Sequence, residues 1–175
     1  MAPVAGASCI AFDRRETTAI PDSSHGSVED CYFSTGGSAG HGVELIEVAK
    51  IRIEGNIFEA LTGAGGHAIK STAGAGIANT SRGIIRNNKF MQNANDVFVV
   101  GDRYLVEGNK LYSTNPVTAG NRINFDGGID TMVLDNTFKD VIADIVKAKG
   151  YKPGITGQWR NMAFDSTVPI VTVPT

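Results

Sequence analysis

The chain has 175 residues, enough for one domain with a sizeable core, and its 42% of hydrophobic residues excludes a disordered composition. Its formal net charge of −2 leaves no basic surplus, so we expect no nucleic-acid partner. No apolar run approaches the roughly 20 residues that a membrane span requires, so we also expect no membrane insertion.

Short apolar segments separated by turn-rich stretches recur along the chain. In chain order, segments of the first kind occupy residues 10–12, 43–45, 68–70, 97–99, 123–125 and, with a weaker pattern, 145–147. Before the next such segment begins, the chain passes through a six-residue motif, at 28–33, 53–58, 85–90, 106–111 and 133–138. The last residues of successive motifs are 25, 32, 21 and 27 positions apart, so one unit recurs with loops of variable length.

Four positions of the motif have a clear physical meaning. The first should point inward from a strand, because it holds the β-branched residues Val28, Ile53, Ile85, Val106 and Val133. The third should bend the strand, because its residues tolerate a positive φ: Asp30, Gly55, Asn87, Gly108 and Asp135. The fourth predicts a ladder of stacked side chains from Asn56, Asn88, Asn109 and Asn136, preceded by Cys31. The sixth predicts a stack in the core from Phe33, Phe58, Phe90, Leu111 and Phe138.

Strand, turn and strand recurring every 21 to 32 residues describe the coil of a parallel β-helix. Leucine-rich repeats need a tighter leucine pattern, a β-sandwich would show hairpin turns, and helical repeats would follow a period near 3.6. We therefore predict an all-β fold, a single-stranded right-handed parallel β-helix of about six coils over residues 1–161, with an irregular C-terminal cap. Residues 162–175 are expected to form a C-terminal extension that packs on the helix or on a neighbouring subunit.

The position just before the inward residue should point outward, and it changes character along the chain. It is polar at Ser27 and Arg52 and apolar at Ile84, Leu105 and Met132. An outward apolar stripe is often an interface, and three parallel coils can pair one face each by cyclic symmetry, so we predict a homotrimer. A loop folded over the stripe is the alternative.

The second motif position supplies a pair of carboxylates as candidate catalytic residues. Glu54 and Glu107 would flank Arg86 two rungs apart, about 9.6 Å on the usual spacing of strands. That distance suits an inverting glycoside hydrolase, and an exposed ion ladder of small stabilising value is the alternative. Asp102 and Asp126 are further catalytic candidates, for which a role in turn formation is the alternative.

Candidate carbohydrate-binding residues are Arg86, Arg103 and the single tryptophan, Trp159. An aromatic ring can stack on a sugar, and the alternative for Trp159 is a place in the core of the end cap. We expect no metal site and no cofactor, because metal-ligand spacing is absent from the histidines, which are interpreted as loop residues: His25, His41 and His67.

The recurring motif ending, clearest at residues 53–58 and 106–111, resembles the coils of pectate-lyase-like β-helix proteins. The short coils and the loss of pattern toward residues 157–160 resemble the C-terminal part of phage tail spikes and tail fibres of that superfamily. The resemblance covers residues 8–161. It implies a virion tail segment that binds a bacterial surface polysaccharide and is inactive alone, within a parent protein that could depolymerise the glycan. The alternative is a secreted polysaccharide-degrading enzyme, a glycoside hydrolase or lyase.

Overall fold

The computed structural model describes residues 8–13, 25–34, 40–46, 48, 50–63, 65–72, 82–100, 103–112, 123–126, 132–139, 146–149 and 159–164. Within these ranges, only the backbone is described at residues 13, 72, 124–126, 138–139, 146–149 and 159–164. The strands of these ranges form two sheets whose neighbouring strands are parallel, and no helix occurs among the described residues. The all-β prediction is therefore confirmed.

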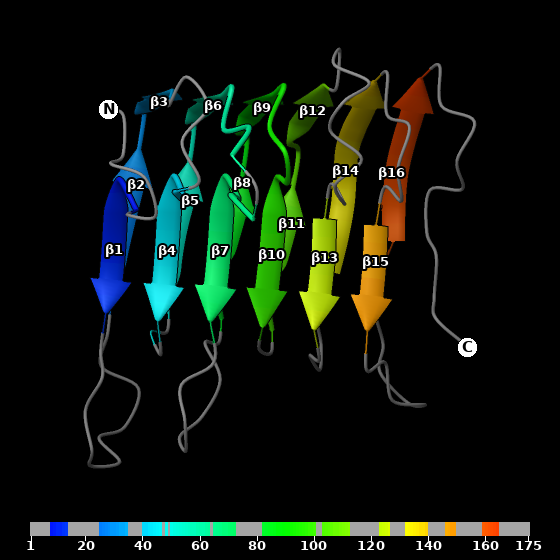
Figure 1. Ribbon diagram of the computed structural model, residues 1–175. Helices are drawn as coiled ribbons and strands as arrows, with labels where there is room; N and C mark the ends of the chain where they lie inside the picture. Colours follow the sequence, from blue (N-terminus) through cyan, green and yellow to red (C-terminus); the bar gives the residue numbers. More distant parts are fainter. Residues whose placement is uncertain are drawn as a thin grey trace.

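The first sheet takes one strand from each successive coil. In sheet order its strands are β1 (Ile10–Asp13), β4 (Val43–Ile46), β7 (Ile69–Thr72), β10 (Val97–Val100), β13 (Ile123–Asp126) and β15 (Val146–Lys149). This order follows the chain, and Figure 1 shows the strands as a row of arrows that all point the same way. The apolar segments predicted as strands between the motifs, including the weaker one near residue 146, therefore stack as the strands of this sheet.

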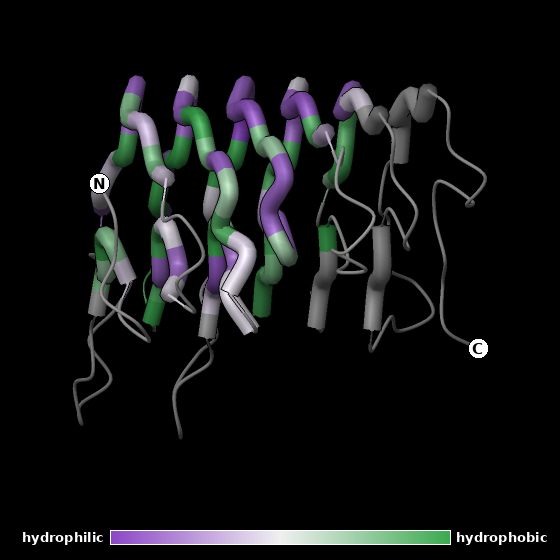
Figure 2. Tube along the Cα trace, turned by 45° about the horizontal axis from the view of Figure 1, so that its top comes forward, coloured by the Kyte–Doolittle hydropathy of each residue, from purple (hydrophilic) through white to green (hydrophobic). Residues whose placement is uncertain are grey.

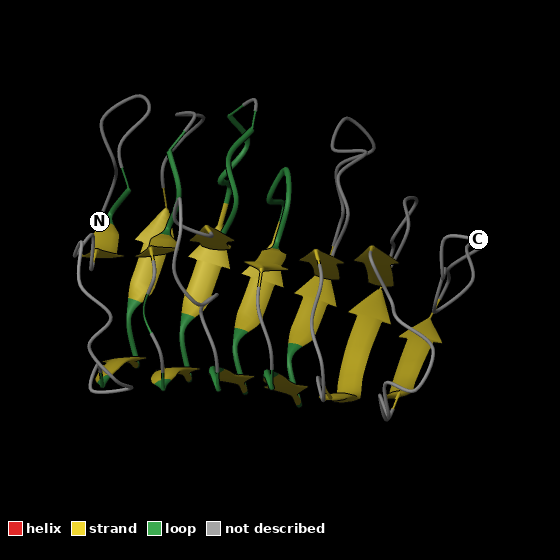
Figure 3. Ribbon diagram, turned by 90° about the horizontal axis from the view of Figure 1, so that it is seen from below, coloured by secondary structure: helices red, strands yellow, loops and turns green. Residues whose placement is uncertain are grey.

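The second sheet contains the six-residue motifs, most of them divided between two strands. One row of strands consists of β2 (Gly26–Glu29), β5 (Ile51–Glu54), β8 (Ile84–Arg86), β11 (Leu105–Glu107) and β14 (Met132–Lys139). From β14 the sheet returns through a second row, β12 (Lys110–Tyr112), β9 (Lys89–Met91), β6 (Ile57–Glu59) and β3 (Tyr32–Ser34). Figure 3 shows the rows from below. A complete coil such as β4, β5 and β6 therefore has three strands rather than the two predicted from the turn pattern.

The bend that divides each motif is a single residue in the left-handed conformation. The φ angle is 52° at Asp30, 70° at Gly55, 56° at Asn87, 63° at Gly108 and 53° at Asp135, as the third column predicts. Glycine, asparagine and aspartate tolerate this conformation at least cost.

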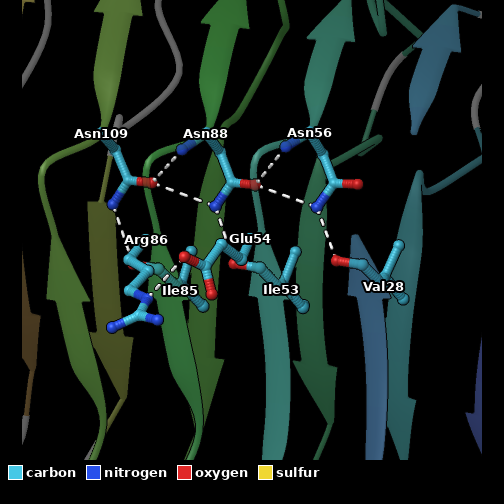
Figure 4. A network of polar contacts seen from close by, with 8 residues as sticks. All are labelled: Val28, Ile53, Glu54, Asn56, Ile85, Arg86, Asn88 and Asn109. Carbon is cyan, nitrogen blue, oxygen red and sulfur yellow. Dashed lines mark hydrogen bonds and ion pairs between the residues drawn. The ribbon is translucent and has the colours of Figure 1, made fainter. Parts of the chain in front are cut away.

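The fourth column forms a ladder of four buried asparagines, Asn56, Asn88, Asn109 and Asn136. Figure 4 shows the first three of them. The Oδ1 atom of Asn88 accepts the backbone N–H and the side-chain amide of Asn56, both at 3.0 Å. Its Nδ2 atom donates to the Ile53 carbonyl at 2.9 Å and to Oδ1 of Asn109 at 3.1 Å. The same set of contacts recurs at Asn109. Both lone pairs and both hydrogens of the amide are used, which explains why a polar side chain is buried here.

The sixth column forms an aromatic stack inside the coils. The ring centroids of Phe33 and Phe58 are 4.7 Å apart and those of Phe58 and Phe90 are 5.1 Å apart, with both pairs 7° from parallel. Leu111 is also fully buried and pairs in register with Phe138, for which only the backbone is described. The β-branched residues of the first column are buried with them, and Figure 2 shows hydrophobic and hydrophilic residues alternating along the coils.

Each of two coils has a second left-handed corner, after the aromatic column, that the sequence pattern did not predict. Ala60 and Gln92 have φ angles of 56° and 55°. The following residue in the later coil is the buried Asn93, whose Oδ1 accepts the backbone N–H of Leu61 at 3.1 Å and whose Nδ2 donates to the Phe58 carbonyl at 3.1 Å. Because a leucine stands at the equivalent position one coil earlier, no asparagine column was visible in the sequence.

The last described strand, β16 (Trp159–Phe164), pairs in parallel with β14. Its register sets Trp159 beside Val133 and Asn161 beside Asn136, with an irregularity between Leu134 and Asn136. Residues 159–164 are therefore aligned with the motif of the preceding coil, but no residue of β16 is aligned with the third motif position, Asp135. The sequence had indicated a loss of the pattern in this segment. The strand ends at Phe164, so residues 162–164 belong to the sheet rather than to the extension expected from residue 162. Residues 165–175 lie outside the described residues.

Candidate functional site

The second motif column lies on the outward face of the second sheet. The strand register sets Glu54 beside Arg86 and Arg86 beside Glu107, in the order expected from the sequence. The Nε atom of Arg86 lies 2.9 Å from Oε1 of Glu54, an ion pair drawn in Figure 4. The Nε–H is not aligned as a hydrogen bond, and the two side chains are 36% and 25% exposed. An ion pair this accessible is worth only about 0–1 kcal/mol, so its contribution to stability is small.

The predicted interface stripe lies on the same face as the ion column. The strand register aligns Arg52 with Ile84, Ile84 with Leu105, and Leu105 with Met132. Met132 is 38% exposed, and Ile84 and Leu105 are partly exposed. The outward face therefore presents an apolar stripe beside a charged column, two residues apart along each strand.

The register or the strand order sets Arg103, Asp126 and Trp159 apart from this column. Arg103 is exposed at the approach to β11, with a φ of 58°. The backbone of Asp126 lies at the end of β13, in register with Lys149, and its side chain is outside the described ones. Asp102 lies outside the described residues altogether. Trp159 takes the register of the inward first column, with no side chain described.

A cluster on the first sheet was missed by the sequence reasoning, which interpreted its histidines as separate loop residues. The rings of His41 and His67 have centroids 5.5 Å apart, and the backbone N–H of His67 donates to Nδ1 of His41 at 3.1 Å. The Nζ atom of Lys70 lies 3.2 Å from Nε2 of His41, and the ring of Phe98 lies 5.5 Å from that of His67. Each histidine stands two residues before its strand, β4 or β7, and this shared offset is the signal that would have revealed the pair.

Burial and nearby charge keep both imidazoles of this cluster neutral at neutral pH. Burial, with smaller contributions from His41 and Lys70, lowers the pKa of His67 to about 4, although its hydrogen bond to the Gly65 carbonyl opposes the shift. Burial and then the charge of Lys70 also lower the pKa of His41, against the opposing influence of Glu44. A neutral imidazole carries one donor and one acceptor, so each ring nitrogen has a defined role.

Neither a metal centre nor a membrane-spanning helix occurs in the described part of the chain. No group of three or more histidine, cysteine, aspartate or glutamate side chains there is placed to hold a metal ion. Nor does that part contain a helix of the length and apolarity needed to cross a membrane.

The stacked parallel sheets, the left-handed corners and the asparagine ladder define a parallel β-helix protein. A comparison with protein families agrees, because the family described as right-handed beta helix region matches residues 8–150. The chain belongs to this family. Neither a curated protein nor a solved structure matches it.

Proposed function

We propose that this chain is a structural and glycan-binding segment of a phage tail spike or tail fibre, which acts outside the bacterial cell as part of a homotrimer. The observation that carries the binding role is the position of Arg86 between Glu54 and Glu107 on an outward sheet face. Membership of the right-handed β-helix family and the resemblance of the repeats to tail proteins support the structural role. The partner is a bacterial surface polysaccharide.

An arginine between the two carboxylates argues for binding a glycan rather than cutting it. An inverting hydrolase needs a water molecule between carboxyl groups that are roughly 6.5–9.5 Å apart. Here Arg86 takes the intervening rung and pairs with Glu54 at 2.9 Å. A guanidinium and carboxylates on successive coils can instead hydrogen-bond the hydroxyl groups of a polymer that lies along the stack.

Binding and cleavage can be separated in one experiment on the whole chain. We expect the protein to bind at least one polysaccharide in a panel of purified capsules and lipopolysaccharides without releasing reducing ends or unsaturated sugars. Arg86→Ala should weaken this binding about tenfold or more, because hydrogen bonds to charged groups are worth roughly 1.5–3 kcal/mol. The matched control is Arg52→Ala, which removes an exposed arginine from the neighbouring column of the same face.

The two contrary outcomes have different meanings. Unchanged binding in Arg86→Ala would mean that the glycan does not bind to this face. Release of sugar products by the wild-type protein, lost in Glu107→Gln, would replace the binding role with that of a polysaccharide-degrading enzyme.

The homotrimer rests on the apolar stripe of Ile84, Leu105 and Met132. Light scattering of the wild-type protein should give a mass near three times the 18.5 kDa of one chain. Leu105→Glu should produce monomers with unchanged far-UV circular dichroism, because a charge at the centre of an apolar interface loses its solvation while the outward position leaves the coil intact.

The control for the stripe is Ser27→Glu, which adds the same charge to the same column in the first coil, where the column is polar and exposed. It should leave the trimer mass unchanged. A wild-type monomer, or a trimer that persists in Leu105→Glu, would mean that the stripe is not the interface.

A further inference from the structure

The first sheet carries a polar and aromatic column on its own outward face. Glu44 of β4, Lys70 of β7 and Phe98 of β10 are aligned in register, and each is partly exposed between buried neighbours on its strand. His41 and His67 lie beside this column, where the chain enters the strands. The arrangement is separate from the Glu54–Arg86–Glu107 column, which belongs to the second sheet.

The hydrogen bonds of His41 determine which of its nitrogens carries the proton. The backbone N–H of His67 can only donate, so the Nδ1 atom that receives it at 3.1 Å must be the acceptor. The proton of the neutral ring is therefore on Nε2, which faces Nζ of Lys70 at 3.2 Å. A lysine ammonium has three donors and no acceptor, so two donors point at one another.

Two converging donors create a site for a shared acceptor. We infer that Nε2–H of His41 and the ammonium of Lys70 bind an oxyanion together, and that the oxyanion is a carboxylate or phosphate group carried by a sugar. Charge-assisted hydrogen bonds from both groups would relieve the donor–donor contact. The ring of Phe98, on the next coil beyond Lys70, offers an apolar surface to the face of the sugar.

The neighbouring charges favour an acceptor with a single negative charge. Lys70 supplies one positive charge, while His41 and His67 are neutral. Glu44 lies beside Lys70 in register and accepts the hydroxyl of Ser8 at 2.6 Å, so its negative charge opposes a second one nearby. A carboxylate is therefore preferred over a phosphate dianion. The sugar in this assignment rests on the proposed glycan-binding function, whereas the oxyanion rests on the donors alone.

The test is a titration of the whole chain followed by the imidazole ¹⁵N signals of His41 and His67. Sodium glucuronate should shift the His41 signals to saturation, glucose 6-phosphate should bind more weakly, and glucose should cause no shift. Lys70→Gln should weaken glucuronate binding by roughly tenfold or more, because one charged donor is lost. The glutamine carbonyl can still accept Nε2–H, so the local fold should persist and remain visible in the His41 signals. Lys89→Gln is the matched control, since Lys89 is an exposed lysine on the second sheet.

Several results would overturn the inference. Equal shifts with glucose and glucuronate would mean that the site does not recognise an oxyanion. An unchanged affinity for glucuronate in Lys70→Gln would mean that Lys70 and His41 do not form the site. Stronger binding of glucose 6-phosphate would reverse the preference for a carboxylate. The polysaccharide panel keeps this test separate from the proposed function, because a chain that binds free glucuronate but no polysaccharide would retain the oxyanion site and lose the glycan-binding role.

Discussion

Replacing Asn88 with alanine should lower the free energy of unfolding by roughly 3–5 kcal/mol, a large effect for a single polar side chain. The change removes four hydrogen bonds at once. It takes one hydrogen-bond partner from the backbone N–H of Asn56, from its side-chain amide and from the Ile53 carbonyl, and Oδ1 of Asn109 keeps only the backbone N–H of residue 88. Each buried polar group left unpaired costs about 1–3 kcal/mol.

The loss should be measured by guanidinium unfolding followed by far-UV circular dichroism. Asn87→Gly is the matched control, because it removes the same side chain one residue earlier from an exposed position with a φ of 56° that glycine adopts readily. It should change stability by less than about 1 kcal/mol. Asn88→Asp should be at least as harmful as alanine, since a carboxylate oxygen would face two acceptors. A loss in Asn88→Ala no larger than that of Asn87→Gly would mean that the ladder contributes little.

Replacing Phe58 with alanine should cost about 3–5 kcal/mol of stability, because it opens a cavity inside the aromatic stack. Phe58 is fully buried and lies between Phe33 and Phe90, at centroid distances of 4.7 and 5.1 Å. A rigid coil cannot collapse far enough to fill the space of the ring, since the strands above and below are held by their backbone hydrogen bonds.

Two controls make this second expectation specific. Phe58→Leu should cost clearly less than alanine, because the same column already accommodates Leu111 in a later coil. Tyr32→Ala, which removes a ring that is 52% exposed, should cost under about 1 kcal/mol. Equal losses for Phe58→Ala and Phe58→Leu in the same denaturant titration would argue against a closely packed stack at this position.

The motif positions that predicted the fold are those at which the structure permits few residue types. In the motif, the left-handed corner holds glycine, asparagine or aspartate, which adopt this conformation at least cost, and a buried asparagine follows it, as at Asn87 and Asn88. That restriction repeats once per coil and is therefore visible without an alignment. At the second corner the positive φ belongs to Ala60 and Gln92, and Asn93 aligns with Leu61 rather than with another asparagine, so no repeated residue type marks that corner in the sequence.

The candidate sites were predictable only where strand register follows directly from the motif. Glu54, Arg86 and Glu107 occupy one motif position, so their alignment could be expected from the sequence. His41 and His67 lie outside the motif, and the one sequence feature they share is that each stands two residues before its strand. Their contact depends on the register of β4 and β7, which the intervening motif does not reveal.

By itself, the sequence determined that the chain is a parallel β-helix, which residues face inward and where each motif turns. Inward β-branched and aromatic positions, left-handed corners and stacked amides each suit few residue types, and they recur at fixed offsets. The tertiary structure decided that each coil has three strands, that Arg86 pairs with Glu54, and that His41 faces Lys70. These features depend on where loops of different length bring separate coils together and on hydrogen-bond directions that only the neighbouring coil can set.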